Sequence, residues 1–453
     1  MKSIFKSLIL SSVLILTSIS VSAQKEINQY NPENLYERGV LLFENHHYAS
    51  ALECFEQFIS STEDKNTDKV IMSKYYEAAS ALFLEDSNGE HKITTFVKEN
   101  PTNLMADKAN FLYANYLFKN RKYRDALNTY KNINANNLNK EEQKENDFKK
   151  AYCYYQTQDI NKATPIFKEL ANAENQYRDD ARYYYAHILY INGSKDEALK
   201  YFNTLKENNK YKDIANIYIL QINFDKGNYN VVTENGDNSL QKAHKSRKSD
   251  IALMLAESWN QQGDYGKSLE YYNIALQNTR RKLPREIEFK IGFCKMKNND
   301  FEGAIEHFAK VTDKSDELGQ YGSYYMAQCY TNTKQDKFAR NTFYKAYKMD
   351  FNDTLKENAL YNYAVLSFIP GIDPFNETVN VLNDYIEKNP KSSHISDYQD
   401  IVIHLLLNSK DYNSVLETLE QYDELSPELK VIQSQLTYNV GIQNYNENNY
   451  KYN

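Results

Sequence analysis

The sequence contains few of the residues that end helices or form tight turns. Its 453 residues include only 13 glycines and 8 prolines. A fold of many short strands needs a glycine- or proline-containing turn every few residues, so this composition argues against an all-β architecture. Because 41% of the residues are apolar and 25% are charged, the chain can still bury a core and is not disordered by composition.

Residues typical of catalytic sites are also scarce. The sequence has 8 histidines and 4 cysteines, and it contains no Cys-x-x-Cys, His-Glu-x-x-His, glycine-rich phosphate loop or nucleophile elbow. His46 and His47 form the one histidine pair, but adjacent residues point to different faces of a helix, so metal binding is the weaker interpretation. We therefore expect a protein that is not an enzyme and that uses no cofactor or metal.

An excess of positive charge is missing as well. Lys and Arg number 54 against 61 Asp and Glu, which gives a formal net charge of −7, and the two signs are mixed along the chain. Such a chain repels the phosphates of nucleic acid, so we expect no nucleic-acid partner.

The N-terminus has the layout of a signal peptide. Lys2 and Lys6 precede an apolar or hydroxylic run from residue 8 to residue 21, and Ala23 ends a small-residue cleavage site. We expect residues 1–23 to be a cleaved signal and residues 24–31 to be a linker; a retained anchor is the alternative. No cysteine at the junction offers a lipid anchor, and no later run is long and apolar enough to span a bilayer.

What the sequence has in abundance is aromatic residues, 40 Tyr and 21 Phe, and many of them recur in one frame. A small residue is followed nine positions later by an aromatic or apolar residue, twelve later by Ala, sixteen later by an aromatic residue and nineteen later by an apolar one. Two copies place a polar residue at the ninth position, and one has Ser for Ala. The seven clear copies begin at Gly39, Ala114, Ala151, Ala186, Ala256, Gly292 and Ala327, and their second small residues are Ala51, Ala126, Ala163, Ala198, Ser268, Ala304 and Ala339.

This spacing predicts a pair of helices in each copy. Offsets of three and four place residues on one helical face, and two small residues twelve apart let consecutive helices approach closely across a tight turn. Turn-forming residues stand at the expected junction in Asn192-Gly193, Gln262-Gly263-Asp264 and Asn298-Asn299-Asp300.

Weaker copies fill the intervals. They centre on Ile93, Val232, Thr378 and Val415, and the ten periods between Ala51 and Val415 average about 36 residues. The predicted organisation is a first block of repeats at 32–234, an irregular loop at 235–248 where Asn235-Gly236-Asp237 truncates a helix, a second block at 249–346, divergent repeats at 347–433, and an incomplete further repeat at 434–453 in which Gly441 and Tyr450 keep the frame.

The small–aromatic–Ala–Phe pattern resembles the tetratricopeptide repeat (TPR), and the resemblance covers essentially everything after the signal. It implies an all-α fold, a right-handed superhelical solenoid of antiparallel helix pairs. The Tyr- and Asn-rich sequence is also similar to exported repeat proteins of Bacteroidetes-type bacteria. That similarity implies the periplasm of a Gram-negative bacterium, with the cell surface or secretion as alternatives.

Aromatic residues also form columns on the first helix of each pair, three residues before, one after and four after the small residue. In the tetratricopeptide family these columns face a concave, partner-binding groove. The residues that the resemblance assigns to partner binding are Phe111, Phe118, Phe148, Tyr152, Tyr155, Tyr183, His187, Tyr190, Phe289, Phe293 and Tyr324. Two interpretations stay open, because these rings can bind a partner or only pack between successive helices.

The function that follows is an exported scaffold that binds other proteins or peptides through its concave face, in envelope assembly or secretion. The alternative is a glycan- or cell-wall-binding protein that uses the same aromatic groove, since aromatic rings also stack on sugars. Cys153, Cys294 and Cys329 each lie two residues after a small residue, so equivalent positions in separate repeats hold them too far apart for a disulfide. The Pro370–Pro374 insert is either a hinge or recognition loop or a tolerated loop at the edge of the solenoid.

Overall fold

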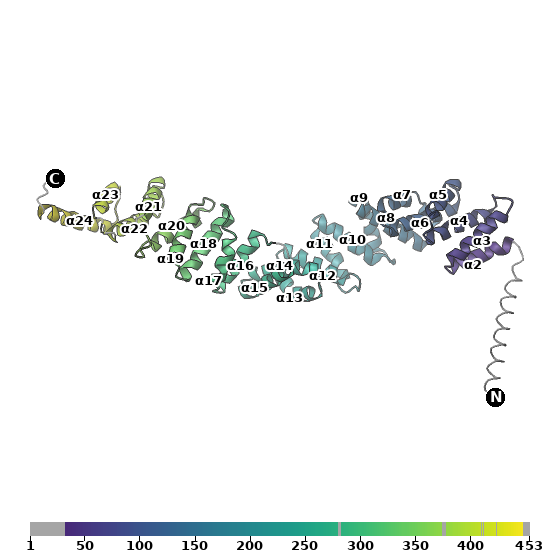
Figure 1. The fold of residues 1–453 in the computed structure, drawn as a ribbon, viewed down its shortest axis with the longest axis horizontal. Coiled ribbons are helices and arrows are strands. Elements are labelled where there is room, and N and C mark those ends of the chain that lie inside the picture. The colour runs from purple at the N-terminus through teal and green to yellow at the C-terminus, as the bar shows by residue number, and fades with distance from the viewer. Residues whose placement is uncertain are drawn as a thin grey trace, which may run out of the picture. The chain divides into compact units, whose positions relative to one another are not determined.

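The computed structural model describes residues 32–279, 282–373, 377–408, 410, 412–422 and 424–446. The predicted signal peptide, the linker at 24–31, Pro374 and Tyr450 lie outside these ranges. Within them the structure has 23 α-helices, one short 3-10 helix at Ala135–Asn137 and no strand (Figure 1). The all-helical fold expected from the sequence is confirmed.

The helices follow one another as pairs, each with a first helix, A, and a second helix, B. The A helices are α2 (Pro32–Glu44), α4 (Asp68–Phe83), α6 (Leu104–Lys119), α8 (Lys140–Gln156), α10 (Arg178–Ile191), α12 (Lys212–Asp225), α14 (Lys245–Gln261), α16 (Arg285–Lys297), α18 (Glu317–Asn332), α20 (Asp353–Leu366), α22 (Ile395–Asn408) and α24 (Pro427–Asn446). The B helices are α3 (Tyr48–Ser61), α5 (Gly89–Glu99), α7 (Tyr123–Lys131), α9 (Ile160–Asn172), α11 (Lys195–Leu205), α13 (Tyr229–Lys242), α15 (Tyr265–Asn278), α17 (Phe301–Ala309), α19 (Asp336–Tyr347), α21 (Glu377–Lys388) and α23 (Tyr412–Gln421).

The repeat frame sets both the helix boundaries and the core. In all seven clear copies the B helix begins at the ninth residue after the small residue, from Tyr48 in α3 to Asp336 in α19. The second small residue is fully buried in every copy, and the aromatic residue four positions later is at most 2% exposed. The ring packs directly against the first helix of its pair: a Cβ at Gly39 would meet the Phe55 ring at 2.8 Å, and one at Gly292 would meet the Phe308 ring at 3.0 Å.

A left-handed residue turns the chain between the two helices, always seven positions after the small residue. It is glycine in only two of the seven clear copies, Gly193 and Gly263. The other five turns use His46, Arg121, Gln158, Asn299 and Lys334, with φ between 57° and 64°. Glycine content therefore understates the number of turns that this chain makes.

At four junctions, neighbouring pairs are joined by a ring stack in which the buried Phe of a B helix lies against a Tyr of the next A helix. Ring centroids in these stacks are 4.7–6.2 Å apart with interplanar angles of 8–23°. The stacked pairs are Phe55 with Tyr76, Phe167 with Tyr184, Phe202 with Tyr218, and Phe308 with Tyr325. Stacking between pairs supplies the core that one pair cannot make alone.

The segment 235–248, predicted as an irregular loop, is instead mostly helical. Helix α13 runs unbroken through Asn235-Gly236-Asp237 to Lys242, and α14 begins at Lys245. A side chain at Gly236 would meet the Leu255 side chain at 2.5 Å. Gly236 thus serves the close approach of α13 to α14, and the prediction was wrong because it took this glycine for a helix breaker.

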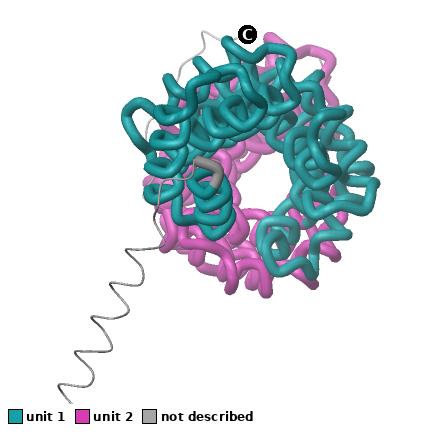
Figure 2. The backbone as a smooth tube through the Cα atoms, turned by 90° about the vertical axis from the view of Figure 1, so that its right-hand side faces the viewer, with its two compact units in different colours: residues 1–219 teal, residues 220–453 magenta. Residues whose placement is uncertain are grey.

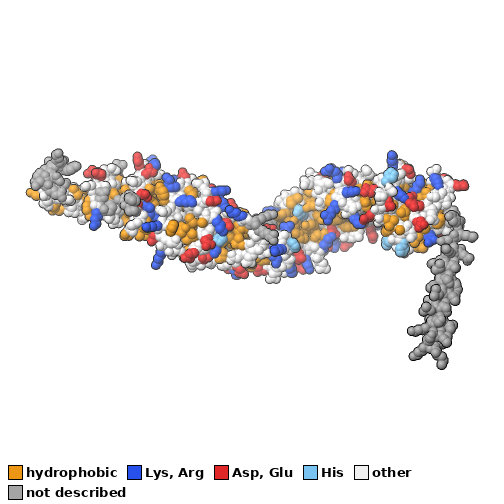
Figure 3. All heavy atoms as spheres, in the orientation of Figure 1, with side chains coloured by type: hydrophobic (Ala, Val, Ile, Leu, Met, Phe, Trp, Pro, Cys, Tyr) orange, Lys and Arg blue, Asp and Glu red, His pale blue; other side chains and the backbone are white. Residues whose placement is uncertain are grey.

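The chain divides into two compact units, residues 1–219 and residues 220–453, and the division falls inside α12 (Figure 2). The boundary at 234 that the repeat pattern suggested lies within α13 instead. The boundary at 434 similarly lies within α24, a single helix of 20 residues. On the face that Figure 3 shows, Lys and Arg side chains are interspersed with Asp and Glu.

Candidate functional site

The first unit contains a hollow of about 450 Å³ on the side formed by its A helices. Its walls come from α6, α7, α8, α10 and the start of α12, so four consecutive repeats contribute. Seven of its ten lining residues are aromatic: Phe118, Tyr123, Phe148, Tyr152, Tyr183, Tyr184 and Tyr211; Asp180, Lys210 and Ile214 complete it. We call this hollow the aromatic groove.

Rings from successive A helices touch one another along the groove. The ring centroid of Tyr152 on α8 lies 5.3 Å from that of Phe118 on α6 and 5.2 Å from that of Tyr184 on α10, in both cases edge to face. Tyr184 also stacks on Phe167 of the core. The groove wall is thus continuous with the packing between repeats, and its rings are held in place from behind.

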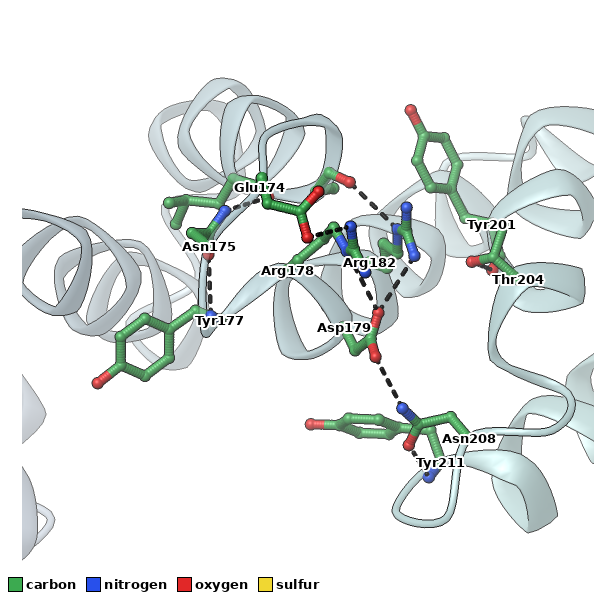
Figure 4. Close-up of polar contacts among 12 residues, drawn as sticks. Glu174, Asn175, Tyr177, Arg178, Asp179, Arg182, Tyr201, Thr204, Asn208 and Tyr211 are labelled. Carbon is green, nitrogen blue, oxygen red and sulfur yellow. Dashed lines mark hydrogen bonds and ion pairs between the residues drawn. The ribbon is translucent and has the colours of Figure 1, made fainter. Parts of the chain in front are cut away.

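The edge of the groove is fixed by polar contacts at the start of α10 and in the loop before α12 (Figure 4). The Asn208 side chain donates to Asp179 at 2.8 Å and accepts from the backbone N–H of Tyr211 at 3.1 Å. Arg182 donates to the same Asp179 at 3.1 Å. These bonds anchor the loop, so that the Tyr211 ring stacks on Tyr183 with 4.9 Å between centroids.

Asp180 carries the charge at this edge. Its carboxylate accepts a hydrogen bond from the Tyr211 hydroxyl and pairs with Lys210. Burial, followed by the hydrogen bond to Asp180, raises the pKa of Tyr211 well above its ordinary range. Tyr211 therefore stays a neutral hydrogen-bond donor at physiological pH.

A strip of rings continues from the groove along α8, α10 and α12. The Tyr155 hydroxyl lies 2.9 Å from Nδ1 of His187, and the rings of His187 and Tyr190 both contact Tyr218. Burial lowers the pKa of His187, so the imidazole is neutral at pH 7. His187 is therefore a polar member of the strip and carries no positive charge.

The structure brings together most of the residues that the sequence singled out in this unit. Phe118, Phe148, Tyr152, Tyr155, Tyr183, His187 and Tyr190 all belong to the groove or the strip. Phe111 does not, because it is only 6% exposed and does not line the groove. Phe111 stands three residues before the small residue Ala114, as the other members of its column do, but at this repeat the side chain is buried in the core.

The three candidates of the second unit make the same ring contacts as their counterparts in the first. Phe289 and Phe293 pack around Tyr325 with centroids 6.0 and 5.4 Å away, and Tyr324 lies edge to face with the core ring of Phe343. Ring contacts alone do not separate packing from binding, because Phe148 and Tyr152 make the same contacts with Tyr184 and also line the groove.

Sequence reasoning missed Tyr184, Tyr123 and Tyr211. Tyr184 stands two residues before the small residue, a column that was not considered, although Tyr218 and Tyr325 occupy equivalent places. Tyr123 stands at the ninth position of its copy, which was not one of the candidate columns, and Tyr211 lies in a loop outside the repeat frame. The available signal was the recurrence of Tyr in the column two before the small residue.

Other candidate chemistry is weak. In the described ranges, no group of three or more His, Cys, Asp or Glu side chains is placed to hold a metal ion. All four cysteines are buried and unpaired, and His46 and His47 are exposed at a turn. Of the helices that the structure describes, none combines the length and apolar character that crossing a membrane requires.

Comparison with known proteins gives similarity at the level of solved structures. No family model and no curated protein matches the chain. Similar structures include YrrB, a TPR protein with an unusual peptide-binding site (18% identity, TM-score 0.37, covering 43% of this chain and 96% of YrrB). A tetratricopeptide repeat protein from Parabacteroides merdae has 13% identity and a TM-score of 0.32, and the match covers 66% of this chain and 98% of that one. The TPR domain of P58(IPK) has 15% identity and a TM-score of 0.26, and the match covers 74% of this chain and 98% of that one. Since all three TM-scores are low, the tetratricopeptide-type fold of this chain rests on its own repeat frame and helix pairs.

Proposed function

We propose that this chain of tetratricopeptide-type repeats is a binding scaffold whose first unit holds an extended segment of another protein or peptide in the aromatic groove. The observation that carries the proposal is the groove itself, in which six aromatic side chains from three consecutive repeats and Tyr211 from the loop before α12 surround one hollow. Large rings on rigid helices offer wide contact area at low entropic cost, and tyrosine hydroxyls add hydrogen bonds to a partner.

The packing of the rings favours a peptide over a sugar. Sugar binding uses open ring faces, but the face of Tyr183 is stacked on Tyr211 and that of Phe148 is stacked on Tyr177. Stacking thus covers one face of each of these rings, while their apolar surface still suits apolar side chains of a peptide. Glycan binding is therefore an alternative outcome of the test below.

The site of action that we propose is the periplasm, in envelope assembly or secretion. The support is the N-terminal pattern of Lys2 and Lys6, the apolar run and the small residues up to Ala23. Cell fractionation and N-terminal sequencing test it: we expect a mature chain in the periplasmic fraction that begins at Gln24. A cytoplasmic chain that keeps its first residues would contradict this part of the proposal.

Binding is tested by selecting peptides from a random library on the purified chain and measuring their affinity by fluorescence polarisation. The variant Tyr152→Ser/Tyr155→Ser should weaken binding by about tenfold or more, because tenfold corresponds to about 1.4 kcal/mol and a single hot-spot tyrosine can contribute about 2 kcal/mol. The matched control is Tyr361→Ser/Tyr412→Ser, since these rings are 50% and 46% exposed outside the groove.

Thermal unfolding of both variants separates binding from packing. A groove variant that unfolds at a much lower temperature but binds peptides normally would show that the rings only pack. Retention of polysaccharide in place of peptides would favour the glycan alternative.

A further inference from the structure

A second, shallow depression of about 680 Å³ adjoins the aromatic groove in the first unit. It is formed at the turns between α6 and α7 and between α8 and α9. Its lining residues are Arg121, Lys122, Tyr123, Arg124, Asp125, Gln156, Thr157 and Gln158. Three cations, one carboxylate and two amides meet here, so its chemistry differs from that of the groove.

The positive charge of this depression is only partly compensated. Lys122 pairs with Glu90 at 3.1 Å, but Arg121 and Arg124 form no ion pair in the part of the chain that the structure describes. Asp125 offers one negative charge beside the two arginines. An excess of positive charge is therefore left at this spot of a chain whose net charge is −7.

Tyr123 belongs to both hollows and makes them one surface. On the groove side its ring lies 5.7 Å from Phe118 and 5.5 Å from Tyr152, centroid to centroid. On the other side it stands between Arg121 and Arg124 in the sequence, and it is the first residue of α7. The amino end of that helix adds partial positive charge to the depression.

We propose that the segment held by the aromatic groove carries acidic side chains, Asp or Glu, next to the apolar or aromatic residue that fills the groove. The carboxylates bind Arg121 and Arg124, and guanidinium groups suit them because they can form two parallel hydrogen bonds. Because Tyr123 lines both hollows and an extended segment covers about 3.3 Å per residue, the acidic residue should lie within about four positions of the residue in the groove. This inference rests on the proposed function and specifies its partner.

The test variant is Arg121→Asn/Arg124→Gln. Arg121 has a φ of 59°, a conformation that asparagine adopts more readily than most residues, so this change removes charge without straining the turn. The matched control is Lys168→Gln/Lys200→Gln, which removes the same charge from exposed positions on α9 and α11.

The probes are library-selected peptides with amidated C-termini, each also made with its acidic residues changed to Gln or Asn. We expect selection to enrich acidic residues within about four positions of an apolar or aromatic one. The arginine variant and the neutral peptides should each lose about tenfold in affinity, and the effect should shrink in high salt. The lysine control should change affinity less than twofold.

Three results would overturn the inference. The first is enrichment of peptides that lack acidic residues. The second is equal affinity of the acidic and neutral peptides for the unmodified chain, a result that no folding defect of a variant can imitate. If peptides bind and Tyr152→Ser/Tyr155→Ser weakens them but the arginine variant does not, only this inference fails. If no peptide is retained, the proposed function and this inference both fail.

Discussion

At the scale of single residues, three positions change together from repeat to repeat. In four of the five clear copies whose B helix buries a Phe, as at Phe167, the next A helix supplies a stacking Tyr such as Tyr184. Where it buries Tyr272, the hydroxyl donates to Glu257 at 2.8 Å, and Lys290 takes the place of the stacking ring. Tyr130, Asn115 and Lys149 repeat this second arrangement. A buried hydroxyl needs a partner, so the choice of Tyr or Phe dictates its neighbours.

The cysteines give a prediction at the same scale. Burial raises the pKa of the Cys153 and Cys329 thiols to about 12, so roughly one thiol in ten thousand is ionised at pH 8. We expect the folded chain to react very slowly with a thiol reagent such as Ellman's reagent, and all four thiols to react at once in guanidinium.

These thiols also affect stability in a defined direction. Above pH 9, where a free thiol ionises, the unfolded chain loses protons that the folded chain keeps, so their contribution to stability falls as pH rises toward about 12. Rapid reaction of the native chain, or a loss of free thiols on oxidation, would contradict the buried and unpaired state.

At the scale of elements, the turn between paired helices provides a test of the frame. Gly193 has a φ of 82°, and a side chain there would meet nothing within 4 Å. Gly193→Ala should therefore lower the free energy of unfolding by about 1 kcal/mol, through backbone strain alone. Gly266 lies inside α15 with an ordinary φ, and Gly266→Ala should cause no loss. Chemical denaturation measures both; equal effects would mean that the left-handed turn is not a constraint.

The insert before α21 forms a second test, because it supplies a buried ion pair. Asp373 accepts from Arg340 at 3.1 Å and from the backbone N–H groups of Glu377 and Thr378, and the Asp373 and Arg340 side chains are 4% and 7% exposed. The residues beyond Asp373 up to 376 lie outside the described ranges. The insert thus ties α19 to α21, which neither sequence interpretation of this loop had anticipated.

Removing this carboxylate should lower the free energy of unfolding. Asp373→Asn leaves the buried Arg340 charge with only a longer pair to the exposed Glu377, at 3.9 Å. We therefore expect the free energy of unfolding to fall by about 3 kcal/mol. Asp350→Asn is the control, because its pair with Lys356 at 2.6 Å is exposed and should contribute less than about 1 kcal/mol. Similar losses for both variants in urea unfolding would show that Asp373 is not a buried anchor.

The elements also show how far the sequence could lead. The small residues and the aromatic residue four places beyond Ala51 or Ala163 predicted the helix pairs, since buried contacts repeat with the frame. The turns at Arg121 and Lys334 were invisible, because left-handed residues other than glycine leave no compositional signal. Gly236 misled because a glycine needed for close helix contact looks the same in sequence as a helix breaker.

At the scale of the whole molecule, the two units differ in where they place aromatic and charged side chains. The first unit carries the aromatic groove and the basic depression beside it. The second unit buries charged groups, among them the Arg340–Asp373 pair and Glu288, which pairs with His307 at 2.7 Å and Lys310 at 3.1 Å. The division inside α12 could not be predicted, because the repeat frame runs on from α11 to α13 without a break in sequence. The groove could be predicted only in part, since Tyr211 reaches it from a loop outside the frame.

The most direct measurement of the central claim is photo-crosslinking from inside the groove. Phe118 is replaced by p-benzoylphenylalanine, a close mimic, and the chain is irradiated with a selected peptide. The account predicts an adduct at this position that excess unlabelled peptide abolishes, and none from the same replacement at Phe338, a ring 61% exposed on α19. Adducts of equal yield at both positions, or at Phe338 alone, would contradict it.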